Sequence, residues 1–326
     1  PAEARPAEAR PAEARPADAG PAPSADGYVM YGVAGRSWVA LGGPVVPADL
    51  PAAAAEARRA ELAWRFREEA DRHGAWPVFY QVPPEQLPLY VDLGLTFMKL
   101  GTEAVVPLDR FAGEALPSKW MRRARKDGGR HGLAFEVLGA AAVPALMPEL
   151  RAVSESWMGD RPTREKGFSL GRFDPAYLAW SPAAVVRREG QVVAFANLWM
   201  GAPGTELAPD LMRHRRDAPN GTMDFLFVEL LRWGAARGYA RANLGMAPLA
   251  GLDARRLAPL WARAGALVAE RGEHFYHFRG LRAFKEKFDP VWTPRYLASP
   301  GGLALPRILT NVAALIAGGL SGVVRK

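Results

Sequence analysis

The sequence predicts an α/β protein made of two consecutive units with mixed sheets, followed by a C-terminal amphipathic helix. Three observations lead to this prediction. Segments that alternate apolar and polar residues follow helical segments along most of the chain. The same order of elements occurs in both halves. A length of 326 residues is enough for about two domains of roughly 150 residues each.

Composition restricts the possible chemistry. The net charge of +8 favours an anionic partner, either nucleic acid or an acidic membrane surface. The chain has no cysteine, so disulfides, zinc–thiolate sites and cysteine nucleophiles are excluded. Its apolar stretches are all shorter than the roughly 20 residues of a membrane span.

The sequence predicts a flexible Pro/Ala-rich linker over residues 1–26, because PAEAR repeats with a proline in every fifth position. A linker at this place leads us to expect a preceding part of a longer chain. The first unit covers 27–115. Its expected elements are strand-like residues at 27–46, a helix at 51–73, a strand at 77–82, a helix at 84–95 and a hairpin at 96–108.

A basic connecting helix occupies 116–132, and the second unit covers 133–302. A turn at Glu189-Gly190 joins a hairpin over 183–200. The other strands are expected at 135–138, 206–213, 241–246 and 295–302, and the helices at 144–157, 223–237 and 259–272. The amphipathic helix at 303–326 ends the chain.

The two halves share the order helix, Gly, strand, Pro, helix, Gly, which indicates a tandem duplication. In each unit, strands precede the first long helix. This is the order of elements in the acetyltransferase (GNAT) fold, so we expect that fold to occur twice. The segment RHRRDAPNGTMD stands where such domains usually carry a Gly-rich CoA loop, and it lacks Gly-x-Gly. We expect Asn220 or Thr222 to cap the helix that follows.

Asp210 and Arg213 lie in an apolar strand just before that turn. Side chains three residues apart on a strand point to opposite faces unless the chain bends between them. The pair is either an ion pair at a strand end or a polar pair in a cleft, with Arg213 directed at an anionic substrate.

The segment FKEKF places Lys285 and Lys287 between two phenylalanines, with Arg279 and Arg282 before them. On a strand both lysines would share one face, which favours a phosphate-facing role over a solvated charge run. His274 and His277 have a metal-like spacing but no evident third ligand, so we interpret them as structural and expect no metal.

The connecting helix concentrates cations, and it is either a solvated link or a contact for RNA or lipid phosphates. Its cations are Lys119, Arg122, Arg123, Arg125, Lys126 and Arg130. In the C-terminal helix, an apolar stripe either packs on a domain or lies in the membrane interface, and its Arg-Lys end slightly favours the second. The stripe consists of Ile308, Leu309, Val312, Leu315, Ile316 and Leu320.

Over about residues 27–320, the chain resembles the C-terminal catalytic domain of bacterial aminoacyl-phosphatidylglycerol synthases, because several long motifs occur in the same order. They include GRSWVALGGPV, PVFYQV, LPLYVDLGL, EKGFSLGRFD, DLMRHRRDAPNGTMDFLF and EHFYHFRGLRAFKEKFDPVWTPRYLA. The resemblance implies a tandem GNAT-like domain at the cytoplasmic face of the bacterial inner membrane, behind a multi-span flippase domain. It also implies transfer of alanine or lysine from aminoacyl-tRNA to a glycerol hydroxyl of phosphatidylglycerol, with no cofactor and no metal. Such transfer lowers the negative charge of the membrane and raises resistance to cationic antimicrobials.

The matching positions are Asp210, Arg213, Lys285 and Lys287. We expect Asp210, Arg213 and Lys285 to be catalytic, with Arg213 and Lys285 holding phosphates and Asp210 orienting Arg213 or accepting the hydroxyl proton. Substrate contacts are expected from Lys287, Arg282, Asn220, Asp224, Glu165 and Lys166. A lysyl site needs a carboxylate such as Glu165, Asp224 or Glu229, whereas an alanyl site needs only a small pocket. Two alternatives stay open, a peptidoglycan-type aminoacyltransferase and a non-catalytic RNA- or membrane-binding module.

Overall fold

The structure is a computed structural model that describes residues 26–113, 116–159, 167–201, 204–248, 250 and 278–318. Within these ranges, one mixed sheet of ten strands runs through the whole molecule in the order β1-β2-β3-β10-β4-β9-β8-β7-β6-β5. The strands are β1 Tyr31–Ala34, β2 Ser37–Leu41, β3 Trp76–Val82, β4 Thr96–Pro107, β5 Leu133–Leu138, β6 Ala183–Arg188, β7 Gln191–Met200, β8 Glu206–His214, β9 Arg241–Pro248 and β10 Val291–Ser299.

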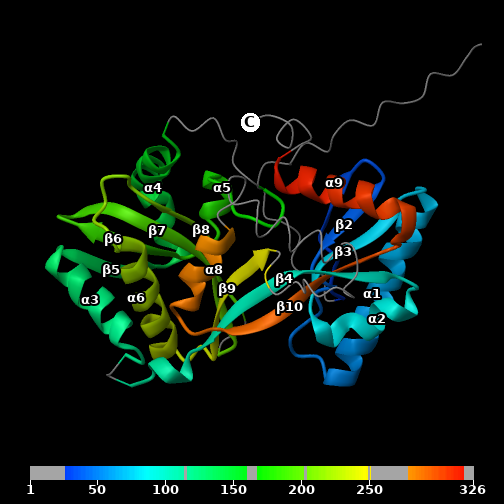
Figure 1. Ribbon diagram of the computed structural model, residues 1–326, viewed down its shortest axis with the longest axis horizontal. Coiled ribbons are helices and arrows are strands. Elements are labelled where there is room, and N and C mark those ends of the chain that lie inside the picture. Colours follow the sequence, from blue (N-terminus) through cyan, green and yellow to red (C-terminus); the bar gives the residue numbers. More distant parts are fainter. Residues whose placement is uncertain are drawn as a thin grey trace, which may run out of the picture.

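Helices cover both faces of this sheet (Figure 1). In the second half, α3 and α6 pack over one face and α4 and α5 over the other, each side with its own apolar core. In the first half, α1 and α2 share one core and α9 covers another. The helices are α1 Ala52–Arg72, α2 Leu87–Asp92, α3 Lys119–Arg130, α4 Val143–Met158, α5 Pro175–Leu178, α6 Thr222–Ala236, α8 Phe278–Glu286 and α9 Leu305–Ile316.

The two halves repeat one plan and exchange their last strands. In each half a helix connects two parallel neighbouring strands, α1 between β2 and β3, and α6 between β8 and β9. The last strand of the first half, β4, pairs with β9 and β10, whereas β10 pairs with β3 and β4. The ranges 27–115 and 133–302 therefore share one sheet, with a strand of each inserted into the other.

Two local predictions are confirmed. Arg72 ends α1 and the long helix lies where it was expected. Glu189 and Gly190 both have positive φ (51° and 81°), which is the backbone of the tight hairpin turn between β6 and β7.

The hairpin expected at 96–108 is wrong. The segment is one continuous strand of 12 residues, β4, in the middle of the sheet. Gly101, in the middle of this segment, pairs with Arg295 on one side and Pro248 on the other. Because both edges of the strand are occupied, the chain continues through the glycine instead of turning.

The apolar stripe of the C-terminal helix packs on the body of the protein. Ile308 is fully buried and Val312 is 5% exposed, against residues of β2, β3 and β10. Asn311 donates a hydrogen bond to the hydroxyl of Ser37 (2.9 Å). The preference for a membrane-interface role of this stripe is thus wrong for residues 305–316, and Leu320 lies outside the described residues.

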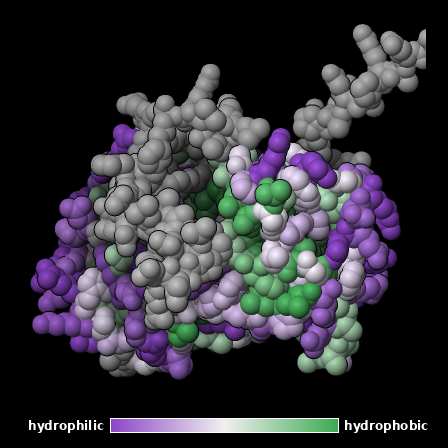
Figure 2. All heavy atoms as spheres, turned by 45° about the vertical axis from the view of Figure 1, so that its right-hand side comes forward, coloured by the Kyte–Doolittle hydropathy of each residue, from purple (hydrophilic) through white to green (hydrophobic). Residues whose placement is uncertain are grey.

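Other apolar side chains of the first half do reach the surface. Near the edge strand β1, Met30 is 50% and Val33 is 53% exposed. In Figure 2, apolar residues (green) gather right of the centre of the view, and hydrophilic residues (purple) lie around them. Among the described helices, none combines the length and the apolar character that a membrane crossing requires.

Candidate active site

A β-bulge in β8 brings Asp210 and Arg213 to the same face of the sheet. Between the pairs Leu198–Pro209 and Ala196–Met212, β8 has one residue more than β7. Leu207, before the bulge, packs in the core under α6, whereas Leu211 packs in the core under α4. The extra residue reverses the alternation of side chains along β8. Asp210 and Arg213, which are three residues apart, can therefore point to the same face.

Asp210 is held by two donors. The amide of Gly171 donates to Oδ1 (3.0 Å), and the hydroxyl of Tyr177 in α5 donates to Oδ2 (2.5 Å). A Cβ at position 171 would lie 2.3 Å from Oδ2 of Asp210, so this close approach requires glycine. The carboxylate is therefore fixed on the face covered by α4 and α5.

Tyr177 is the centre of a larger network. Its hydroxyl accepts hydrogen bonds from Nδ2 of Asn197 (3.2 Å) and Nε1 of Trp199 (2.7 Å) while donating to Asp210. Burial, and next the hydrogen bond to Asp210, raise the pKa of Tyr177 to about 12, so the hydroxyl stays protonated near neutral pH.

Asn197 ties this network to the bulge. It is 1% exposed, and its Oδ1 accepts the amide proton of Leu211 (2.8 Å), inside the bulged segment. One buried amide group thus sets both the path of β8 and the position of Tyr177.

Arg213 extends from the same face of β8 toward α4. Its side chain is buried (7% exposed), and its guanidinium carbon lies 3.9 Å from the centre of the Trp157 ring. A cation over an aromatic face is stabilised by the ring quadrupole, more so when it is desolvated. The structure places Asp210 against Tyr177 and Gly171, and an orienting role of Asp210 toward Arg213 stays a prediction.

The strands β8 and β9 pair only at their beginnings within the described chain. Glu206 pairs with Arg241 and Leu207 with Ala242, and the later residues of the two strands make no further pairs with each other. Asp210 and Arg213 belong to the separated part of β8. In Figure 1, α8 lies beside the separated part of β9.

Lys285 reaches this part of β9 from α8. It is 6% exposed, and its Nζ donates to the carbonyl oxygens of Gly245 (2.9 Å) and Met246 (3.0 Å). Burial lowers the pKa of Lys285 to about 8, and the carboxylate of Glu103 opposes this shift. The lysine makes these contacts and not one with Asp210.

The strand expected for FKEKF is wrong, because α8 is a helix. Phe284 and Phe288 are four residues apart, which is one helical turn, and both pack in the core near α6. Lys287 therefore does not share a face with Lys285. Its Nζ pairs with the carboxylate of Asp224 (3.0 and 3.2 Å) and lies over the ring of Trp120.

The other expected substrate contacts are scattered. Arg282 pairs with Glu286 (3.6 Å) on the surface of α8 and stacks over Trp292. Asn220 is exposed at the start of α6. Glu165 and Lys166 lie outside the described residues, as do His274 and His277.

The expected cap of α6 is also wrong. Its N-cap residue is Gly221, in the left-handed region (φ 85°), without a side-chain capping bond. Thr222 instead donates its hydroxyl proton to the carbonyl of Pro219 (2.6 Å). Glycine takes this conformation at little cost, so the chain turns here without the polar cap that the sequence pattern predicted.

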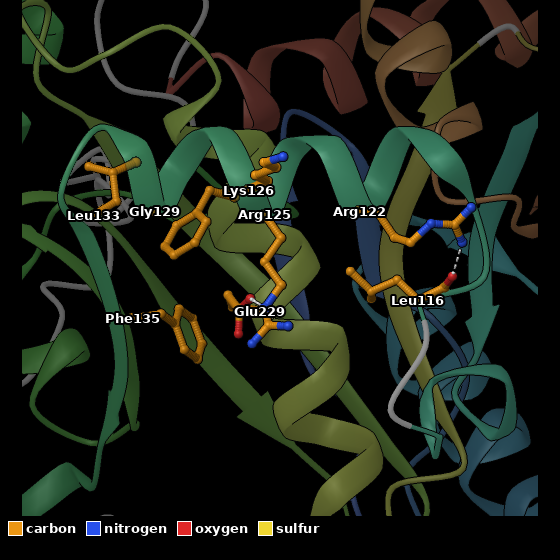
Figure 3. A pocket seen from close by; sticks show the side chains of 9 residues that line it. Leu116, Arg122, Arg125, Lys126, Gly129, Leu133, Phe135 and Glu229 are labelled. Atoms are coloured by element: carbon orange, nitrogen blue, oxygen red, sulfur yellow. Dashed lines mark hydrogen bonds and ion pairs between the residues drawn. The ribbon is translucent and has the colours of Figure 1, made fainter.

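The basic residues of α3 lie on the other face of the sheet from Asp210. A cavity of about 540 Å³ runs along this helix, between α3, α6 and β5 (Figure 3). Arg125 pairs across it with Glu229 of α6 (2.8 Å), and Arg122 donates to the carbonyl of Leu116 (2.7 Å). The cavity is lined by Leu116, Arg122, Arg125, Lys126, Gly129, Leu133, Phe135, Phe225 and Glu229.

Sequence patterns did not single out Tyr177, Asn197, Trp199 or Trp157. Asn197 gave a usable signal, because it is the one amide side chain within the apolar run VVAFANLWM. Tyr177 and Trp157 gave none, because their partners are 33 and 56 residues away along the chain. Among the described residues, no group of three or more His, Asp or Glu side chains is placed to hold a metal ion.

Known proteins are similar to this chain over most of its length. Residues 19–299 match the family described as "Phosphatidylglycerol lysyltransferase, C-terminal". A phosphatidylglycerol lysyltransferase of Bacillus subtilis is 39% identical over 253 residues, covering 77% of this chain and 29% of the relative. The chain thus spans less than a third of that relative's length.

Two solved structures are also similar. The C-terminal domain of a putative lysylphosphatidylglycerol synthetase from Agrobacterium fabrum has 41% identity and a TM-score of 0.77, with 90% of each chain covered. The structure of L-PGS from Bacillus licheniformis has 36% identity and a TM-score of 0.74, over 90% of this chain and 86% of that one. These similarities confirm the predicted α/β fold class, and the chain belongs to the family of phosphatidylglycerol lysyltransferase C-terminal domains.

Proposed function

We propose that this chain transfers an aminoacyl group from aminoacyl-tRNA to a glycerol hydroxyl of phosphatidylglycerol. The observation that carries the proposal is the burial of two cations, Arg213 (7% exposed) and Lys285 (6%), beside the separated parts of β8 and β9. Burying a cation is costly, so a fold that keeps each of these two buried beside the separated strands is suited to an anionic substrate. Both substrates of this reaction carry phosphates.

The reaction exchanges one ester for another. The glycerol hydroxyl attacks the carbonyl carbon of the aminoacyl ester, and the bond to the terminal ribose oxygen of the tRNA breaks. The proton of the glycerol hydroxyl ends on that ribose oxygen, so no other reactant is needed. Arg213 and Lys285 hold phosphates or stabilise the negative charge that develops on the carbonyl oxygen.

Asp210 has a positioning role in this proposal. Each of its carboxylate oxygens already accepts a hydrogen bond, one from Gly171 and one from Tyr177. Because both oxygens already have donors, the geometry favours positioning over proton abstraction. Tyr177 and Asp210 together keep β8 and its Arg213 in place beside the substrates.

Lysine is the favoured amino acid, because the relatives are named lysyltransferases. A lysyl side chain needs a carboxylate partner. Asp224 already pairs with Lys287, and Glu229 pairs with Arg125 and Arg232 (2.8 and 2.9 Å). These two acids are therefore weaker candidates for that role than the sequence indicated.

The place of action follows from the two substrates. Phosphatidylglycerol lies in the membrane and charged tRNA in the cytoplasm, so the domain works at the cytoplasmic face of the bacterial inner membrane. A flippase domain in the same full-length protein would then receive the product. The partial coverage of the longer relatives supports this arrangement.

Label transfer tests the proposal. The purified chain is incubated with phosphatidylglycerol vesicles and tRNA charged with radiolabelled lysine or alanine, and the lipids are extracted. We expect label from lysine in the lipid, strongly reduced in Lys285→Ala and nearly unchanged in Lys287→Ala. No label from either amino acid, with a folded chain that binds vesicles, would refute the proposal and favour an amine acceptor of the peptidoglycan type.

A further inference from the structure

The cavity beside α3 combines a row of cations with a wall that is partly apolar. Five cations at positions 119, 122, 123, 126 and 130 recur at helical spacing and form one stripe along the helix. At 1.5 Å per residue this stripe is about 16 Å long. Arg122 and Lys126 belong to the stripe and also line the cavity.

Apolar side chains, two of them aromatic, form one part of the cavity wall, and the ion pair of Arg125 with Glu229 forms another. Leu116, Leu133 and Phe225 line it and are at most 7% exposed, while Phe135 is partly buried. Figure 3 shows Phe135 on β5 facing the cavity from below α3. A Cβ at Gly129 would meet nothing within 4 Å, so this glycine leaves the space along the helix open.

We propose that this cavity and the cation stripe form an RNA-binding site, with backbone phosphates along the stripe and one unpaired base inside the cavity. A volume of about 540 Å³ accommodates a nucleotide, and stacking on an aromatic side chain accepts any base. The inference deepens the proposed function, because charged tRNA is the donor there.

A lipid bilayer fits this surface less well. A helix that lies in the membrane interface exposes an apolar face. The apolar residues of α3 face the core instead, with Met121 2% exposed and Gly128 against Phe225. The site therefore offers cations and a recessed cavity, and no apolar surface that could enter a bilayer.

Two kinds of variant separate the two parts of the site. Arg122→Ala with Lys126→Ala removes two phosphate contacts, so we expect RNA affinity to fall at least tenfold. The slope of log affinity against log salt should decrease by roughly 0.7 to 0.9 per contact. Gly129→Leu fills the cavity without changing charge, so we expect about a fivefold or greater loss of affinity with an unchanged slope. Arg65→Ala with Arg72→Ala on α1 removes two exposed cations as well; it is the matched control and should bind like the unmodified chain.

The measurement is fluorescence anisotropy of uncharged tRNA with the full chain, with thermal melts to confirm folding. Unchanged RNA affinity in the double variant or in Gly129→Leu would overturn the inference. Loss of binding to phosphatidylglycerol vesicles with RNA binding retained would assign the site to lipid and also overturn it. The binding assay involves no aminoacyl transfer, so the two proposals can fail separately. If RNA binding depends on the cavity but no label reaches the lipid, only the proposed function is refuted.

Discussion

The hydroxyl of Tyr177 donates a hydrogen bond to Oδ2 of Asp210 while it accepts one from Asn197 and one from Trp199. Tyr177→Phe removes the hydroxyl to which Asn197 and Trp199 donate. It also removes one of the two hydrogen bonds that Asp210 accepts. We expect the transfer rate to fall by about tenfold or more, because Asp210 and the bulged strand lose their fixed position. The free energy of unfolding should fall by about 1 to 3 kcal/mol.

The test of this prediction measures kcat and KM for transfer beside a urea denaturation curve. Trp199→Phe is a useful comparison, because it removes one donor from the exposed rim (Trp199 is 55% exposed) and leaves the bond between Tyr177 and Asp210 intact. If Tyr177→Phe transfers at the normal rate, the network has only a structural role.

Lys285 should make stability depend on pH in a defined range. Its pKa is lowered from 10.5 to about 8 in the folded chain. Between pH 8 and 9.5 the unfolded chain keeps this proton and the folded chain loses it, so the free energy of unfolding rises with pH. Over this interval the lysine contributes an increase of about 2 kcal/mol.

Urea denaturation at several pH values checks this expectation against Lys285→Met, which should lack the increase. The range ends at pH 9.5 because Tyr177, with its raised pKa, begins to act in the opposite direction near pH 10. Lys287→Met serves as control and should keep the increase. Parallel curves for the unmodified chain and Lys285→Met would contradict a buried lysine with a lowered pKa.

Lys287 should contribute little compared with Lys285. Its side chain is 38% exposed and pairs with Asp224 on the surface. Exposed ion pairs stabilise proteins by about 0 to 1 kcal/mol. We expect Lys287→Ala to change the free energy of unfolding by less than about 1 kcal/mol and to leave kcat within about twofold. A loss of activity as large as that of Lys285→Ala would restore the substrate-binding role that the sequence predicted.

The different positions of Lys285 and Lys287 show that the sequence did not decide between a strand and a helix for FKEKF. Lys285 and Lys287 are two residues apart, which fits a strand, but the two phenylalanines are four residues apart, which also fits a helix. Tertiary packing on Phe227 decided between them. A pattern of five residues contains both periods, so it could not have been resolved locally.

The bulge in β8 gives a second example. The sequence located Asp210 and Arg213 on a strand and showed that a shared face required a bend. Whether the bend existed depended on Asn197 of the neighbouring strand, which accepts the amide proton of Leu211. The topology, in contrast, was largely predictable, because the repeated order of helices and strands specified two similar units. The exchange of β4 and β10 was not, since strand order depends on long-range pairing.

The C-terminal helix allows a further test of packing against membrane contact. Ile308 is fully buried between α9 and the sheet. Ile308→Ala should lower the free energy of unfolding by about 2 to 5 kcal/mol, the range for deleting buried methyl groups. Binding to phosphatidylglycerol vesicles, measured by sedimentation, should not change in the folded variant. Weaker vesicle binding without a change in stability would mean that this stripe faces the lipid.

Two adjacent glycines in α3 form a matched pair for the packing of this helix. A Cβ at Gly128 would lie 2.2 Å from Cδ2 of Phe225 in α6, whereas a Cβ at Gly129 meets nothing within 4 Å. Gly128→Ala forces α3 and α6 apart and should destabilise the chain by about 1 to 3 kcal/mol. Gly129→Ala should stabilise it by up to about 1 kcal/mol, because alanine favours the helix. Thermal and urea unfolding measure both changes. Equal effects of the two substitutions would mean that α3 is not packed against Phe225, and the cavity between α3 and α6 would then lack the fixed shape that base binding requires.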